Sequence, residues 1–281
     1  MDSADWLVAM LNRLSQGAGS ATNDLLLSPE VYNADLYSAA LTIHSTAVKP
    51  VTSIVLSIMF VLMLATTSTR AEGDRELGVR IVAATMFKIA LVFVVAQNAV
   101  LLLEAIASIA TSITNTANSV DVGTGGGDAA LMGDAMRDDL DDLGNMEKFG
   151  MIVILFLPWV VQKIAAVIAI VLVFIRFLQM YMLTAFASLP LAFLGHDDTK
   201  SIGIGYLKGF ASVAFTGVII VVAVKMYQAL LGGWLGNIGS YDGDMVGFIF
   251  GNFGQFFVAP IVLIFLLFGA NGLAKKVIGE G

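Results

Sequence analysis

Five stretches of this sequence are apolar over a length that constrains the fold more than any other feature. They cover residues 36–67, 78–113, 149–177, 206–231 and 246–273. Each stretch exceeds the roughly 20 residues that an α-helix needs to cross the hydrocarbon core of a bilayer. The sequence therefore predicts an all-α fold, a polytopic membrane helical bundle with about five transmembrane helices.

The composition excludes the main soluble classes. Hydrophobic residues make up 58% of the 281 residues and charged residues 13%, and the mean hydropathy is +0.86. A soluble domain with a polar surface does not reach such values, so a soluble enzyme and a disordered chain are both excluded. The absence of cysteine excludes a disulfide scaffold.

Residues 1–35 are predicted to form an N-terminal amphipathic, extracytoplasmic segment. We expect no cleavable signal peptide, because Asp2 and Asp5 stand where a signal is basic. The apolar residues that recur at helical spacing are Trp6, Leu7, Met10, Leu11 and Leu14. Such an amphipathic helix lies either in a membrane interface or against the rest of the protein, and both placements stay open.

Residues 36–113 are predicted to hold the first two membrane helices and a short charged cytoplasmic loop. Pro50 is expected to divide the first stretch into a pre-helix and a span that begins at residue 51. The second stretch, 78–113, would be about 50 Å long as a single helix, at about 1.5 Å per residue. We therefore expect this helix to tilt, kink or protrude from the bilayer.

Residues 149–281 are predicted to hold helices three to five, and within them 178–195 is either a sixth span or a hydrophobic hairpin that ends near Pro190. The distribution of Lys and Arg favours five spans and a hairpin on the cytoplasmic side. The cytoplasmic flanks then hold Arg70, Arg75, Arg80, Arg176, Lys200, Lys275 and Lys276, and the outer flanks hold Arg13, Lys49, Arg137 and Lys148. A sixth span would invert this bias. We therefore expect the N-terminus outside and the C-terminus inside.

The net charge of −7 belongs to one segment, the predicted extracytoplasmic loop 114–148. Its acidic residues are Asp121, Asp128, Asp134, Asp138, Asp139, Asp141, Asp142 and Glu147, against the single basic Arg137 before residue 148. We expect a solvated loop, because the Asp cluster lacks the alternating ligands and closing Glu of an EF-hand. Its acidity would repel phosphates, so protein partners or cations are expected there, and no sequence-specific nucleic-acid binding.

No motif predicts a catalytic, cofactor-binding or metal-binding site. The chain lacks the GxxxxGK-Ser/Thr loop that cradles phosphates, and the glycines Gly123, Gly125, Gly126 and Gly127 are expected to form a linker. His44 and His196 are the only histidines, and neither belongs to an HExxH motif or has a cysteine partner. We therefore expect no enzyme activity, no cofactor and no metal.

Charged and polar residues within the apolar stretches are the candidate functional residues, because a charge in lipid costs several kcal/mol unless it faces protein or water. They are Lys88, Asn98, Glu104, Lys163 and Lys225. For Lys88, Glu104 and Lys163 we expect a place in the bundle interior or at a subunit interface. The alternative is that they line a charged conduit. Lys225, like Lys208, is expected to snorkel to a membrane interface.

Small residues on two later helices predict close helix packing. Gly205 and Gly209 form one GxxxG pattern, Gly247 and Gly251 form another, and Gly254 extends the second. GxxxG allows two helix backbones to approach each other closely. The nearby Phe-rich half of the last span is either an interfacial aromatic belt or an oligomer contact.

The order of these features resembles the TrbL/VirB-type polytopic channel subunits of type IV secretion and conjugation machines. The closest local match runs from Arg176 through Pro190 to Lys200 and then into a "GYLK"-like helix start at Gly205. The end of the fourth span, at Lys225, also fits the family pattern. The short external loop is closer to the compact forms found in mobile elements of Gram-positive bacteria.

This resemblance implies a membrane subunit that is not an enzyme. Copies would assemble as a homo-oligomeric ring in the bacterial cytoplasmic membrane and help to form the passage for DNA or protein. Membrane lipid, other membrane subunits and the ATPases of the machine would be its partners. The alternative is a multi-span transporter or ion channel in which Lys88, Glu104 and Lys163 form a substrate or proton path.

Overall fold

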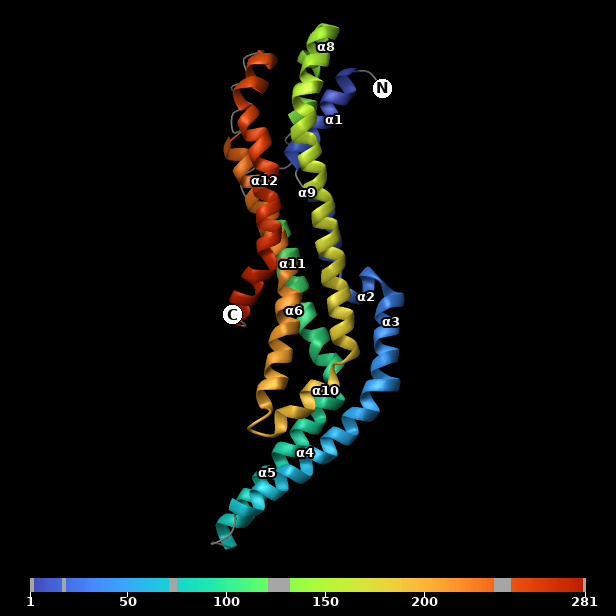
Figure 1. Cartoon of the computed structure of the whole chain (residues 1–281), viewed down its shortest axis with the longest axis vertical. Helices are drawn as coiled ribbons and strands as arrows, with labels where there is room; N and C mark the ends of the chain where they lie inside the picture. Colours follow the sequence, from blue (N-terminus) through green and yellow to red (C-terminus); the bar gives the residue numbers. More distant parts are fainter. Residues whose placement is uncertain (1–2, 17–18, 71–74, 121–131, 235–243, 280–281) are drawn as a thin grey trace. The chain divides into compact units, whose positions relative to one another are not determined.

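The computed structural model describes residues 3–16, 19–70, 75–120, 132–234 and 244–279. The chain divides into two compact units. Unit one comprises Met1–Leu26, Ile113–Phe174 and Gly217–Asn271, and unit two comprises Leu27–Ser112, Ile175–Thr216 and Gly272–Gly281. Every element in the described residues is helical (Figure 1). The expected glycine linker, together with Asp121 and Asp128, lies outside the described residues.

Six helices in the described part of the chain are long and apolar enough to cross a membrane. Their ranges are Ala34–Ser68, Gly78–Gln97, Ala99–Ser119, Asn145–Ala185, Lys200–Leu230 and Val246–Ile278. This confirms the prediction of an all-α polytopic membrane protein. The count exceeds the five apolar stretches because the second stretch is divided into two helices.

The division of the second stretch falls at Asn98. Helix α5 (Arg75–Gln97) ends just before it and α6 (Ala99–Ser119) begins just after it. The side chain of Asn98 donates a hydrogen bond of 2.8 Å to the carbonyl of Val94, and its backbone N–H donates to the same carbonyl at 3.1 Å. Asn side chains compete in this way with regular helical bonding. The structure therefore has two helices that meet at Asn98, where one long helix over 78–113 was expected to tilt, kink or protrude.

The first membrane stretch is not divided at Pro50. Helix α3 (Ala34–Ile43) leads through a π-helical turn, η2 (His44–Val48), into α4 (Lys49–Arg70). Pro50 is the second residue of α4, in its first turn, where the missing N–H is tolerated. The wide turn is closed by a bond from the Lys49 N–H to the His44 carbonyl. The expected pre-helix thus corresponds to α3 and η2, which run on into the span. Helix α2 (Pro29–Tyr32) precedes them, separated by the extended residue Asn33.

In unit one, helix α1 (Ser3–Gln16) packs on two short helices from the acidic segment, α7 (Met132–Ala135) and α8 (Arg137–Asp142). The side chains buried in this part of unit one include Leu7, Leu11, Met132, Met136 and Leu140. Of the two placements that the sequence left open, the structure has α1 against the protein. The segment 132–142, expected as a solvated loop, is helical because its apolar residues have this helix to pack on.

Polar contacts hold α7 and α8 to α1. The Asn12 side-chain oxygen accepts hydrogen bonds from the backbone N–H of Gly133 at 2.7 Å and of Asp134 at 3.2 Å. These N–H groups belong to the first turn of α7 and have no partner within that helix. Arg137 forms an ion pair of 2.8 Å with Asp5. Asn12 therefore caps a helix that lies 121 residues further along the chain.

In unit two, the expected hairpin is shorter than 178–195. Helix α9 runs over Asn145–Ala185, so 178–185 belongs to that helix. The return is made by α10 (Ser188–Leu191) and η3 (Ala192–Gly195), which lead to α11 (Lys200–Trp234). Pro190 lies in the first turns of α10, where the helix tolerates it.

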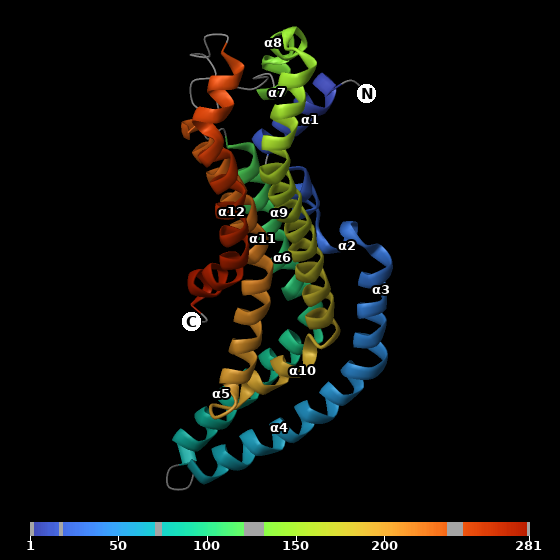
Figure 2. The same cartoon turned by 45° about the horizontal axis from the view of Figure 1, so that its top comes forward.

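Helix α10 is fixed to α4 by a buried hydrogen bond of 2.8 Å between the hydroxyls of Thr52 and Ser188. Helices α4, α5 and α10 lie side by side in both views (Figures 1 and 2). The last helix, α12 (Met245–Ile278), and a 3-10 turn after α1, η1 (Gly19–Leu26), complete the described elements. The return segment is not among the candidate spans.

Candidate functional site: polar contacts between the helices

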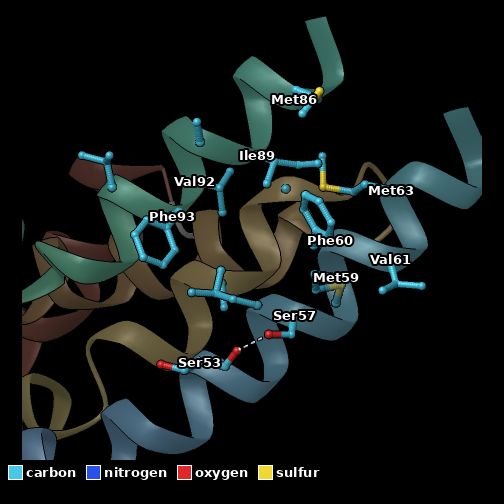
Figure 3. Close-up of a pocket in the computed structure, with 15 residues that line it drawn as sticks. Ser53, Ser57, Met59, Phe60, Val61, Met63, Met86, Ile89, Val92 and Phe93 are labelled. Atoms are coloured by element: carbon cyan, nitrogen blue, oxygen red, sulfur yellow. Dashed lines mark hydrogen bonds between the residues drawn. The ribbon is translucent and has the colours of Figure 1, made fainter. Parts of the chain in front are cut away.

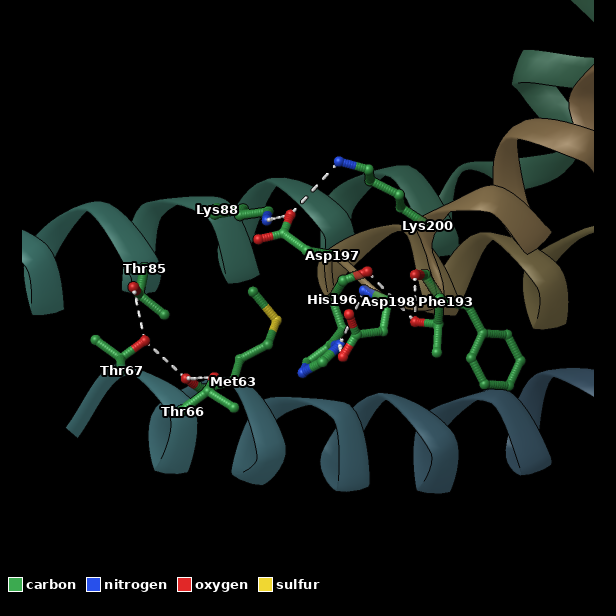
Figure 4. A network of polar contacts seen from close by, with 11 residues as sticks. Met63, Thr66, Thr67, Thr85, Lys88, Phe193, His196, Asp197, Asp198 and Lys200 are labelled. Atoms are coloured by element: carbon green, nitrogen blue, oxygen red, sulfur yellow. Dashed lines mark hydrogen bonds and ion pairs between the residues drawn. The ribbon is translucent and has the colours of Figure 1, made fainter. Parts of the chain in front are cut away.

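A polar cluster joins α5 to the loop between η3 and α11 (Figure 4). The Lys88 Nζ lies 3.2 Å from Asp197 Oδ1, and the Lys200 Nζ lies 3.8 Å from the same oxygen. The Nδ1 atom of His196 lies 3.7 Å from Asp198 Oδ2. We call these five residues the loop cluster. Because the ion pairs are exposed, each contributes at most about 1 kcal/mol to the stability of the fold. They matter instead because they place charged groups between α5 and the start of α11.

Hydroxyl groups surround the loop cluster and shape the loop. Thr199 donates a hydrogen bond of 2.9 Å to the Phe193 carbonyl, which closes the turn before α11. Thr67 of α4 and Thr85 of α5 lie 3.1 Å apart, hydroxyl to hydroxyl. Each of these two threonines also donates to a carbonyl of its own helix, at Met63 and Ile81. Their oxygen lone pairs can therefore accept hydrogen bonds from another group.

Arg176 is not at a loop flank, as its place in the expected hairpin implied, but inside α9. Its side chain is only 2% exposed. One nitrogen donates a hydrogen bond of 3.2 Å to the Ala214 carbonyl of α11, while Nε and Nη1 have no partner in the described residues. The guanidinium lies 4.8 Å from the centre of the Phe177 ring. Burial of two unsatisfied donors is costly, so this arginine is the least satisfied buried cation that the structure describes.

Aromatic residues connect the end of α9 to the segment before α4. The Tyr32 ring stacks on Phe177, with centroids 3.9 Å apart and planes 9° from parallel. The Tyr181 hydroxyl donates a hydrogen bond of 2.6 Å to the Pro29 carbonyl. These contacts hold helix α2 against the end of α9.

Glu104 has a partner on another helix, as a charge within an apolar stretch requires. It accepts a hydrogen bond from the Tyr37 hydroxyl, which comes from α3. Lys88 has Asp197. The two residues that the sequence placed on one helix are therefore engaged with separate partners.

In unit one, Lys163 lies 5.3 Å from the centre of the Trp159 ring, a cation–π distance. The neighbouring Gln162 is buried and accepts a hydrogen bond of 3.3 Å from the Tyr227 hydroxyl. Lys225, two residues before Tyr227 on α11, is partly exposed. Within the described ranges, neither Lys163 nor Lys225 forms an ion pair.

The residues of the "GYLK"-like start lie in the first turns of α11 and make two contacts. The Tyr206 hydroxyl donates to the Leu183 carbonyl at the end of α9. Lys208 donates a hydrogen bond of 3.0 Å to the Gly279 carbonyl after α12. This segment therefore joins the ends of three helices in unit two.

The glycines of the GxxxG patterns do not face a neighbouring helix in the same chain where the structure describes their surroundings. A Cβ atom added to Gly205, Gly251 or Gly254 would meet no atom within 4 Å outside its own helix backbone. At Gly247 it would meet only the carboxylate of Asp244. The open surface on α11 and α12 leaves these small faces available for a partner helix.

The sequence identified Lys88 and Lys200 but missed the anions between them. Asp197 and Asp198 were not singled out, because the pairing of Lys88 with Asp197 spans 109 residues and leaves no local pattern. The available signal was the His-Asp-Asp run directly after an apolar segment. No group of three or more His, Asp or Glu side chains in the described part of the chain is arranged to hold a metal ion.

The long apolar helices and the polar contacts between them define a polytopic α-helical membrane protein. The model of the TrbL/VirB6 plasmid conjugal transfer like protein family matches residues 14–188, well over half of the chain. The chain therefore belongs to the TrbL/VirB6 family, as its resemblance indicated. The match covers α3 to α9 and ends before the "GYLK"-like segment that carried the local resemblance. No curated protein and no solved structure matches the chain.

Proposed function

We propose that this protein is a cytoplasmic-membrane subunit of a type IV secretion or conjugative transfer machine. Copies of it assemble with one another and with other membrane subunits, and they border the passage for DNA or protein. ATPases of the same machine supply the energy, and this chain catalyses no reaction. The family match over residues 14–188 is the single observation that carries this proposal.

The orientation belongs to the same proposal. The N-terminus, α1 and the acidic helices lie outside the cytoplasm, and the C-terminus lies inside. The support is the excess of Lys and Arg at the ends assigned to the cytoplasm. The two lysines in the last turn of α12 are part of that excess.

Assembly of copies is supported by surface that one chain leaves uncovered. Only 11% of the apolar window of Gly78–Gln97 is buried within the chain. The open glycine faces of α11 and α12 allow close approach of another backbone. In a membrane, helix association depends on such packing, because lipid tails are as apolar as the helices themselves.

A transporter or ion channel with a path through Lys88 and Glu104 is less well supported. Lys88 is paired with Asp197 and Glu104 with Tyr37, so each charge already has a partner on another segment. We expect no solute flux from the purified protein in liposomes. Flux that is abolished by Lys88→Ala or Glu104→Ala would support the transporter instead.

Disulfide crosslinking tests the assembly, because the natural chain contains no cysteine. Gly254→Cys places a thiol on the open face of α12, and oxidation of native membranes should give crosslinked dimers. The matched control is Ala259→Cys on the same helix, whose side chain is only 1% exposed and which should stay monomeric. Monomers alone from cysteines at Gly254, Gly251 and Gly205 would contradict assembly through these faces.

A further inference from the structure

An apolar groove runs between α4 and α5 of unit two, and Ala192 and Gly195 of η3 also line it (Figure 3). Its volume is about 670 Å³. Phe60 and Met63 of α4 approach Ile89 and Val92 of α5 across the groove, as the close-up shows. Such a volume lies in the range of pockets that hold small molecules.

A second, polar cavity of about 200 Å³ adjoins the groove. Met63 and Gly195 line both cavities, so the two adjoin at these residues. The polar cavity is lined by Thr66, Thr67 and Thr85 and by most of the loop cluster. An occupant of both would have an apolar part and a polar end.

Along both helices the apolar groove and the polar cavity follow each other in the same direction. On α4 the groove extends from Ser53 to Met63 and the polar cavity follows as far as Thr67. Ten residues of helix span about 15 Å, which is half of the roughly 30 Å hydrocarbon core. On α5 the polar cavity is lined by Thr85 and Lys88, and the groove continues to Val94. Both helices therefore place the polar cavity toward the α4–α5 connection.

The charges that line the polar cavity determine which polar group an occupant could place there. Its lining contains one lysine, Lys88, against two aspartates, with Asp197 already shared between Lys88 and Lys200. The side chain of Asp198 is 89% exposed, and the threonine oxygens add further acceptors. This surface favours a group with several N–H donors, and Lys88 favours a phosphate beside it. A primary ammonium has three donors, whereas a quaternary ammonium has none.

We propose that this site binds one phospholipid with an ethanolamine headgroup. An acyl chain lies along the groove between α4 and α5, the ammonium lies by Asp198 and the threonines, and the phosphate lies by Lys88. In the proposed orientation this is a lipid of the cytoplasmic leaflet. The lipid covers part of the α5 surface that the chain itself leaves exposed.

Gly195 offers a direct way to block the site. A Cβ atom at this position would lie 2.8 Å from the Met63 sulfur and 3.7 Å from a Val92 methyl, at the junction of the two cavities. Gly195→Leu should therefore fill the junction. Gly272→Leu on α12 is the matched control, because a Cβ atom there meets open space and the residue lies outside the GxxxG patterns.

Native mass spectrometry tests the proposal on the full chain, purified in mild detergent and equilibrated with equal amounts of phosphatidylethanolamine, phosphatidylcholine and phosphatidylglycerol. Wild type and Gly272→Leu should each retain one phosphatidylethanolamine. Gly195→Leu should lower that occupancy about tenfold, which corresponds to about 1.4 kcal/mol. Asp198→Asn, at a side chain that is 89% exposed, should abolish the preference for phosphatidylethanolamine over phosphatidylcholine.

Three results would overturn the proposal. They are a wild-type protein that retains no lipid or prefers phosphatidylglycerol, equal phosphatidylethanolamine occupancy in Gly195→Leu and Gly272→Leu, and an unchanged preference in Asp198→Asn. A disulfide between copies through a cysteine at Leu56 would also overturn it, because a second chain would then occupy the groove. None of these results depends on whether the protein acts in secretion.

Discussion

Replacement of Gly133 by alanine should release the acidic helices α7 and α8 from α1. A Cβ atom at this position would lie 2.3 Å from the Val8 carbonyl oxygen and 2.7 Å from the Asn12 side-chain oxygen. The Val8 carbonyl is helix backbone and cannot turn aside, so α7 must move away. Such overpacking costs about 1–3 kcal/mol, and each Asn12 hydrogen bond that is lost costs about 1 kcal/mol more. Alanine regains at most about 1 kcal/mol of helix propensity.

The net cost is about 2 kcal/mol or more, which weakens docking roughly 30-fold. The direction of the effect identifies the close contact with α1, because the same substitution in a free helix or loop would be neutral or stabilising. Met136→Cys provides the readout, since this side chain is fully buried at the start of α8. Maleimide should label the cysteine at least tenfold faster when Gly133→Ala is added.

The matched control is Gly150→Ala on α9, where an added Cβ meets no atom within 4 Å. It should leave the labelling rate of the cysteine at Met136 unchanged. Equal labelling rates with and without Gly133→Ala would refute the close packing of α7 on α1. A rise in both variants would show that α9, and not the α1–α7 contact, controls access.

Three further predictions concern single positions. Arg176→Met should leave the Tm in detergent unchanged or raise it, because replacing a buried cation that has unsatisfied donors by an apolar side chain can stabilise a protein by up to about 4 kcal/mol. A large fall in Tm would contradict the claim that two donors of Arg176 lack hydrogen-bond partners. Glu104→Gln keeps an acceptor for the Tyr37 hydroxyl and should melt like wild type, whereas Glu104→Leu should cost about 1–3 kcal/mol; equal Tm values for the two would argue against this bond. A cysteine at Ser240, outside the described residues, should react with an impermeant reagent on intact cells, and labelling only after permeabilisation would contradict the orientation.

Length and hydropathy predicted most of the helices, because spanning a bilayer requires long apolar segments whatever their partners are. The second stretch was expected to tilt, kink or protrude, but the position of the break at Asn98 was not predicted, because one polar side chain decides it by its bond to the preceding turn. The extension of α9 past Arg176 was missed for a different reason. The arginine was interpreted as a flank at a membrane edge, whereas the fold buries it beside Phe177 and bonds it to the Ala214 carbonyl of α11.

Contacts between distant parts of the chain account for what the sequence did not predict at the site. Helical periodicity predicted α1, but its partner is a segment whose acidity suggested a solvated loop, and Asn12 meets Gly133 across 121 residues. The loop cluster likewise unites Lys88 with Asp197, which neither local motif nor spacing indicates. Intramembrane charge was a useful guide nonetheless, because Lys88 and Glu104 both required partners and both have them.

Transfer frequency in a donor strain that lacks this gene tests the central claim most directly. If the protein is a membrane subunit of a secretion machine, deletion should reduce transfer of DNA or protein to the background level. Wild-type gene supplied on a second plasmid should restore it, and the Gly254→Cys variant should restore it only under reducing conditions. Undiminished transfer without the gene, together with a loss of uptake or export of a small solute, would contradict the account.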